Sequence, residues 1–226
     1  FRPANAEFGY FATFYWADGQ TLVAGRNSPW TLVSGDKLTP TTPVTLRLET
    51  DGLTIDRTVS LDDEYMFTFT DTVTNTSDAP RSVRAIGSIE RYGEYQKFLE
   101  ATDPGSSRAG AAHMGLMGET DGNLRLKKFK PLIQLKKIKG EAADGTFPTD
   151  KGGWWGLSDK YWLGALIPQQ DVHFAGLVDK RKIASGGDLE LRTESAALDL
   201  APGASATMTN RIFGGAKRYQ VLRDYE

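Results

Sequence analysis

Turn signals recur at short intervals along this sequence and leave room only for short segments of secondary structure. They combine Gly, Asp, Asn and Ser, and they lie at 17–20, 34–36, 50–52, 75–78, 120–122 and 184–187. Between them apolar and polar residues alternate, most clearly from Glu64 to Asn75, where Phe67 and Phe69 are separated by threonines. A period of two is typical of a half-buried strand, and β-branched and aromatic residues suit its pleated surface. The pattern predicts many short strands.

The chain is predicted to form one large β domain and a short C-terminal helix. It has 226 residues, a length that all-β sandwiches reach as a single domain. No repeat of 20–50 residues indicates a propeller or solenoid. Only 216–226 has apolar residues at helical spacing, after the glycine pair Gly214 and Gly215, which we interpret as a break. We therefore predict an all-β fold, a large antiparallel sandwich over 1–215, with a helix at 216–226.

Composition and charge exclude several classes of function. There are 27 Lys and Arg against 29 Asp and Glu, a net charge of -2, so nucleic acid is not an expected partner. The absence of cysteine excludes disulfides, thiolate metal sites and a cysteine nucleophile. The apolar stretch 162–168 is far shorter than the roughly 20 residues of a membrane-spanning helix. The chain starts at Phe1 without a signal peptide, and we interpret it as part of a longer protein.

No motif in the sequence predicts a catalytic residue, a metal ion or a cofactor. The only histidines, His113 and His173, accompany no nucleophile motif, and no metal-binding helix or phosphate-binding loop occurs. The acidic run 62–64 lies between two strand patterns, where Asp is favoured because its side chain bonds nearby backbone amides. We interpret both histidines and the acidic run as structural.

The stretch 124–139 is basic, with seven Lys or Arg, no acidic residue and apolar residues in between. Pro131 argues against one continuous helix. Lysines near a bilayer gain about 1 kcal/mol each from anionic headgroups, so this stretch is a candidate membrane-facing patch. The favoured alternative is a twisted hairpin whose lysines keep an exposed edge from pairing with other chains. The candidate contact residues are Lys127, Lys128, Lys130, Lys136 and Lys137, together with Lys217 and Arg218.

Aromatic residues are dense just after position 150, with Trp154, Trp155, Tyr161 and Trp162 close together. Such rings can form a sugar-binding platform, but aromatics are also the largest contributors to a β-sandwich core. We favour the core interpretation for this cluster.

The segment from Lys151 to Pro168, KGGWWGLSDKYWLGALIP, resembles the signature of the periplasmic domain of the YidC family of bacterial membrane protein insertases. Stretches 38–46, 59–75 and 213–225 resemble the same domain in the same order. The residues WGLSDK within the signature are most similar to alphaproteobacterial members of the family. The signature residues are Gly152, Gly153, Trp154, Tyr161, Trp162 and Pro168. We interpret them as structural: the glycines permit tight turns and the aromatics fill the core.

The resemblance implies a fold, a location and partners. The fold is a galactose-mutarotase-like β-supersandwich that lacks one or more N-terminal strands here and continues through a helix toward a membrane span. The location is the periplasmic face of the inner membrane, within a multi-pass protein that inserts membrane proteins. The implied partners are Sec translocon subunits and nascent membrane proteins, and an anionic membrane surface is a further possible contact.

Three roles follow from the sequence and the resemblance. The leading one is a non-catalytic docking or scaffold domain. A chaperone-like binder of unfolded segments would use an apolar groove or an open sheet edge. A carbohydrate epimerase is the least favoured, because it needs a histidine acid and a glutamate base that converge on the sugar, and fold alone does not carry function.

Overall fold

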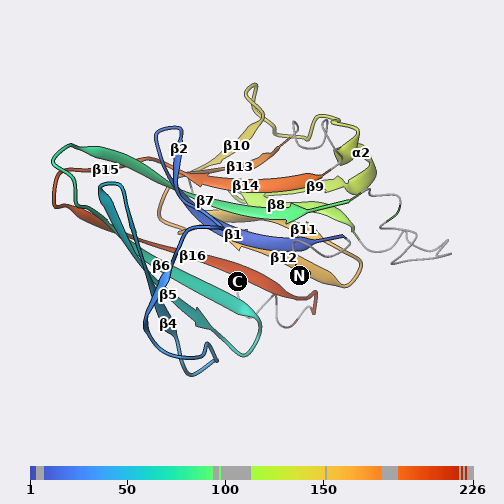
Figure 1. Ribbon diagram of the computed structural model, residues 1–226. Coiled ribbons are helices and arrows are strands. Elements are labelled where there is room, and N and C mark those ends of the chain that lie inside the picture. Colours follow the sequence, from blue (N-terminus) through green and yellow to red (C-terminus); the bar gives the residue numbers. More distant parts are fainter. Residues whose placement is uncertain are drawn as a thin grey trace.

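Two large antiparallel sheets packed against each other make up the computed structural model (Figure 1). It describes residues 1–3, 8–93, 97, 113–150, 152–179, 188–218, 220 and 222. The turn predicted at 184–187 and the signature residue Lys151 lie outside the described residues. No described helix is long and apolar enough to cross a membrane.

The first sheet has the order β10-β13-β14-β7-β1-β2, with the short β15 alongside β7. Its strands are β1 (Tyr10–Asp18), β2 (Thr21–Ala24), β7 (Arg81–Arg91), β10 (Thr146–Thr149), β13 (Phe174–Val178), β14 (Leu189–Ser195) and β15 (Leu198–Leu200). β7 lies in the middle, paired with β1 on one side and with β14 and β15 on the other.

The second sheet has the order β3-β4-β5-β6-β16-β12-β11-β8-β9, so β3 and β9 are its two edges. Its strands are β3 (Thr31–Ser34), β4 (Val44–Thr50), β5 (Leu53–Leu61), β6 (Met66–Asn75), β8 (Gly115–Thr120), β9 (Asn123–Lys128), β11 (Gly153–Ser158), β12 (Trp162–Ile167) and β16 (Ser205–Ala216). The short helix α2 (Phe129–Ile133) follows directly after the edge strand β9.

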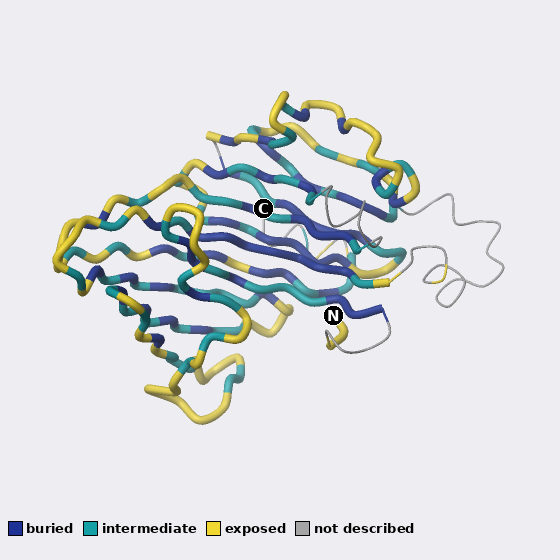
Figure 2. The backbone as a smooth tube through the Cα atoms, turned by 45° about the horizontal axis from the view of Figure 1, so that its top comes forward, coloured by how far each residue is buried: buried dark blue, intermediate teal, exposed yellow. Residues whose placement is uncertain are grey.

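The core lies between the sheets, and it follows the alternation seen in the sequence. Figure 2 shows buried positions along the central strands and exposed ones at turns and edges. In β6, Phe67 and Phe69 pack against the main core cluster, while Thr70 and Thr72 pair through their hydroxyls with threonines of β16 on the other face. The prediction of an all-β, large antiparallel β-supersandwich is confirmed.

The chain end departs from the prediction. β16 continues through Gly214 and Gly215 to Ala216, and these residues pair with β12, so the interpretation of the glycine pair as a break is wrong. Gln220 and Leu222 are helical, and the Leu222 N–H donates to the Arg218 carbonyl at 3.1 Å. Most of the predicted helix 216–226 lies outside the described residues, and the boundary between 215 and 216 stays a prediction.

Candidate functional site

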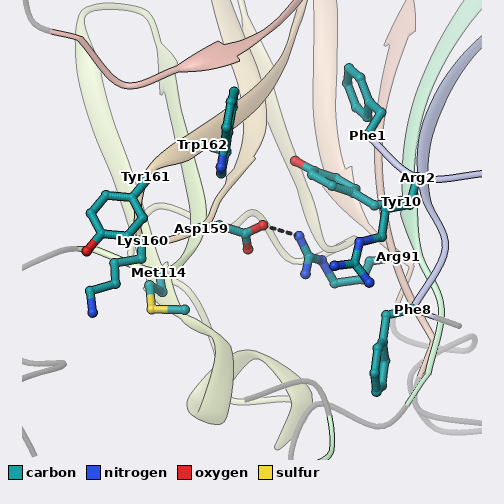
Figure 3. A pocket seen from close by; sticks show the side chains of 10 residues that line it. All are labelled: Phe1, Arg2, Phe8, Tyr10, Arg91, Met114, Asp159, Lys160, Tyr161 and Trp162. Atoms are coloured by element: carbon teal, nitrogen blue, oxygen red, sulfur yellow. Dashed lines mark hydrogen bonds and ion pairs between the residues drawn. The ribbon is translucent and has the colours of Figure 1, made fainter. Parts of the chain in front are cut away.

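A pocket of about 420 Å³ opens at one end of the sandwich, where the turn between β11 and β12 faces the start of β1 (Figure 3). In Figure 3, Lys160, Tyr161 and Trp162 lie on one side of Asp159, and Phe1, Tyr10 and Arg91 lie on the other. The described lining residues are Phe1, Arg2, Phe8, Tyr10, Arg91, Met114, Asp159, Lys160, Tyr161 and Trp162.

A partly buried ion pair, between Arg91 and Asp159, lines this aromatic pocket. Arg91 Nη2 donates to Asp159 Oδ2 at 2.6 Å, and the Arg91 guanidinium lies 4.3 Å from the centre of the Tyr10 ring. The other carboxylate oxygen, Asp159 Oδ1, is buried and accepts no hydrogen bond from the described residues. A buried acceptor left without a donor costs about 1–3 kcal/mol. Asp159 Oδ1 therefore holds an unused hydrogen-bond acceptor beside the pocket.

Tyr10 forms the floor of the pocket and keeps its proton. Its hydroxyl donates to the Leu157 carbonyl at 3.0 Å, and the ring is buried. Burial raises the pKa of Tyr10 well above its ordinary value, although the nearby Arg91 opposes this. Tyr10 thus acts as a neutral hydrogen-bond donor that ties β1 to β11, and its ring offers an apolar face to the pocket.

The signature residues divide into a buried and an exposed group. Trp155, beside the signature residue Trp154, is fully buried and Pro168 is buried, whereas Tyr161 is 65% exposed and Trp162 is 57% exposed. The expectation that the aromatics of this segment fill the core is therefore wrong for Tyr161 and Trp162. They flank the tight turn at the end of the sheet, where no described strand covers them.

The signature glycines occupy backbone conformations that favour glycine. Gly152 has φ 81° and Gly153 has φ 136°, in the region that residues with a Cβ rarely adopt. A Cβ at Gly153 would lie 2.2 Å from the backbone oxygen of Glu119 on the neighbouring strand β8. Both facts agree with the structural interpretation of the pair. Trp154 is half-buried on the outer face of the sheet, against the cluster of buried residues that includes Leu163 and Phe213.

The basic stretch 124–139 forms the edge of the second sheet. β9 pairs with β8 in a hairpin, so only the first part of the stretch, up to Lys128, forms a strand. Pro131 lies within the five-residue helix α2, and the stretch is not one continuous helix, as predicted. Leu124 and Leu126 are exposed, as is Leu135 after α2. The other candidate contacts Lys128, Lys130, Lys136 and Lys137 are exposed as well.

Two internal contacts fix this basic edge to the fold. The Lys127 ammonium donates to the Lys137 carbonyl at 2.6 Å, which joins β9 to the segment after α2. Phe129, Leu132 and Ile138 are buried in the main core cluster. The exposed leucines and lysines thus stand on a backbone that is anchored beneath them.

Lys217 and Arg218 differ from the other candidate contacts. The Lys217 ammonium donates to Ser158 Oγ at 2.9 Å and to the His113 carbonyl at 3.2 Å, and burial lowers its pKa. These bonds tie the end of β16 to β8 and β11. Lys217 therefore has a structural role that the sequence analysis missed. Arg218 forms an exposed ion pair with Glu64 at 2.8 Å.

No catalytic group is assembled among the described residues. A serine beside a lysine of lowered pKa can be a nucleophile, but Ser158 is fully buried and its hydroxyl donates to the His113 carbonyl at 3.0 Å. His113 lies just before β8, while His173 pairs with the exposed Asp150 near the other end of β8. They do not converge on one site, and no described group of three or more potential ligands could hold a metal ion.

The two antiparallel sheets place the chain in the β-sandwich class of all-β domains. The model of the YidC periplasmic domain family matches residues 1–226, so the chain belongs to that family.

Curated relatives agree with this assignment. Proteins called membrane protein insertase YidC are 33% identical over 96% of the chain in Paracoccus denitrificans and 34% identical over 99% in Ruegeria pomeroyi. The protein of that name from Rhizobium meliloti is 34% identical over 100% of the chain. The chain covers 33%, 37% and 36% of these relatives, so it spans about a third of their length.

Among solved structures, a putative aldose 1-epimerase from Escherichia coli K12 is similar at a TM-score of 0.49 and 9% identity, covering 83% of this chain and 68% of that one. Likeness at this level carries no argument about activity. The relatives of clear sequence similarity bear the name of an insertase, not of a carbohydrate enzyme.

Proposed function

We propose that this chain is the non-catalytic periplasmic domain of a membrane protein insertase, and that it docks other proteins at the periplasmic face of the bacterial inner membrane. The expected partners are subunits of the Sec translocon. The observation that carries the proposal is the edge strand β9 with the helix α2, where Leu124, Leu126 and Lys128 are exposed at alternate positions on a fixed backbone.

The basic edge combines the features that protein docking needs. Among the described residues β9 pairs with β8 and with no other strand. The backbone groups on its outer side can therefore pair with a strand of a partner protein. Leu124 and Leu126 supply apolar surface, and Lys128 beside them supplies positive charge. Lysines on an edge discourage pairing with random strands, which leaves a partner with acidic groups as the one that fits.

Crosslinking tests this surface directly. A photo-crosslinking residue at Leu126 in the full-length insertase, in native membranes, is expected to form adducts with a Sec subunit. Leu32 on β3 is a matched control, because it is an exposed leucine on the opposite edge of the same sheet. Equal adducts at both positions would show that β9 has no special role, and adducts with nascent chains alone would favour a chaperone function instead.

The pocket supports a second candidate, chaperone-like binding of extended peptide segments. Its rings offer apolar surface, and a shift of the Arg91–Asp159 pair would let the unpartnered Asp159 Oδ1 accept a donor such as a peptide N–H. A free backbone amide is what an unfolded segment presents and a folded protein does not.

Peptide binding is testable with a labelled, extended apolar peptide and fluorescence anisotropy. Asp159→Asn is expected to weaken binding about tenfold, the size of one charge-assisted hydrogen bond. Asp150→Asn is the matched control, because Asp150 is exposed and lies outside the pocket. Absence of binding by the unaltered chain, or an equal loss in both variants, would remove the chaperone candidate.

A further inference from the structure

The exposed aromatic side chains of the described residues gather around the last residues of β16. Trp162 pairs with Ala216, and the Tyr161 carbonyl accepts from the Lys217 N–H at 2.8 Å. The Tyr65 carbonyl accepts from the Gly214 N–H at 3.2 Å, and the Phe1 ring lies so close to Gly214 that a Cβ there would be 2.4 Å from Phe1 Cε2. We call this surface the aromatic rim; its members are Phe1, Tyr65, Tyr161 and Trp162, all more than half exposed.

The large exposed aliphatic side chains lie elsewhere. They occur on β2, β3 and β9 and after α2, at Leu22, Leu32, Val33, Leu124, Leu126 and Leu135. The aromatic rim therefore differs from the other exposed apolar surfaces of the described residues, which are formed by aliphatic side chains. Trp and Tyr have an apolar ring with a polar tip, which suits a boundary between hydrocarbon and water.

The charges around the aromatic rim come close to cancelling, because two ion pairs leave Arg2, Lys160 and Lys217 against Asp62 and Asp63. Arg218 is paired with Glu64, and Arg91 is paired with Asp159. The Lys160 ammonium lies 5.4 Å from the centre of the Tyr161 ring, and the acidic residues of the turn before Tyr65 are close by along the chain. Attraction to this rim must therefore come from burial of the rings, whereas the basic edge of β9 depends on opposite charge.

We infer that the aromatic rim inserts into the headgroup region of the lipid bilayer and holds the β16 end of the sandwich against the membrane. The inference rests on the proposed function, which places the domain beside a membrane. A bilayer fits better than a soluble partner, because the rim unites ring-type aromatics with nearly cancelled charge, and because the relatives carry the name membrane protein insertase. Lys217 and Arg218 follow β16 within the aromatic rim, where the Lys217 N–H donates to the Tyr161 carbonyl.

The test uses the chain attached by a C-terminal histidine tag to nickel-chelating lipid, in phosphatidylcholine vesicles with or without brominated acyl chains. Bromine quenches tryptophan that lies at the acyl boundary. The chain has five tryptophans, so the emission of Trp162 is taken as the difference between the unaltered chain and Trp162→Phe. We expect brominated lipid to lower this difference at least about twofold, as insertion at the interface requires. The bromine-dependent loss should disappear in Trp162→Phe and shrink in Tyr161→Ala, which keeps the reporter. Adding the anionic lipid phosphatidylglycerol to the vesicles should change the bromine-dependent quenching little.

Trp30→Phe is the control, because Trp30 is half-buried under the Arg57 guanidinium, away from the rim. That variant should keep the full bromine effect. Equal quenching in the unaltered chain and in Trp162→Phe would overturn the inference, and so would quenching that needs anionic lipid, since it would assign contact to the basic edge. The crosslinking at Leu126 reads a different surface, so this inference and the docking proposal can fail separately.

Discussion

Replacing Asp71 by alanine is expected to lower the free energy of unfolding by about 3–5 kcal/mol, the cost of leaving a buried charge unpaired. Arg57 donates to Asp71 through Nε at 2.8 Å and through Nη2 at 2.7 Å, and Trp16 Nε1 donates to the same carboxylate at 2.6 Å. All three side chains are buried. Alanine at position 71 would leave a buried guanidinium and a buried indole N–H without their acceptor.

Urea unfolding followed by circular dichroism measures this loss, and Asp56→Ala provides the control. Asp56 accepts two hydrogen bonds from Arg47 across neighbouring strands, the same arrangement on an exposed surface. Exposed pairs contribute about 0–1 kcal/mol, so Asp56→Ala should cost little. Similar losses in the two variants would show that burial does not set the value of the Arg57 pair.

The inward positions of Arg57 and Asp71 can be predicted from the sequence, but their direct pairing cannot. Asp71 occupies an inward position in the alternating pattern of β6, in phase with Phe67, Phe69 and Val73, and Arg57 is in phase with Ile55 on β5. Opposite charges at inward positions of successive strands are a signal for a buried pair. Their direct pairing follows only from the register, which aligns Arg57 with Asp71 and depends on the turn between the strands.

The pocket could not be predicted from the sequence, because its walls come from segments that are far apart along the chain. Tyr10, Arg91, Met114 and Asp159 belong to four different parts of the chain and meet only when both sheets are assembled. The basic edge was predictable in outline, since seven cations without an acid cannot be buried. The structural role of Lys217 was not, because its acceptors at 113 and 158 are distant in sequence.

Because the signature segment has buried and exposed aromatics, we expect two of its tryptophans to differ sharply in how much they contribute to the free energy of unfolding. Trp155→Ala is expected to cost about 3–5 kcal/mol, as truncation of a fully buried aromatic does. The Trp155 ring lies 4.9 Å from that of Phe147 in the other sheet, and its Nε1 donates to the Leu177 carbonyl at 3.1 Å. It also lies close over Gly118 and Gly176, where a Cβ would be 2.6 Å and 2.9 Å from the ring. The substitution would therefore open a cavity where the sheets meet.

Trp162→Ala is expected to cost no more than about 0.5 kcal/mol, because the ring is mostly exposed. Urea unfolding of both variants, beside the unaltered chain, measures the contrast. If Trp162→Ala were as damaging as Trp155→Ala, Trp162 would be part of the core in solution, and the aromatic rim would lose a member. If the contrast holds, stability explains Trp155 but not Trp162, and the exposed ring of Trp162 is available, with the other rings of the aromatic rim, for a contact outside this chain.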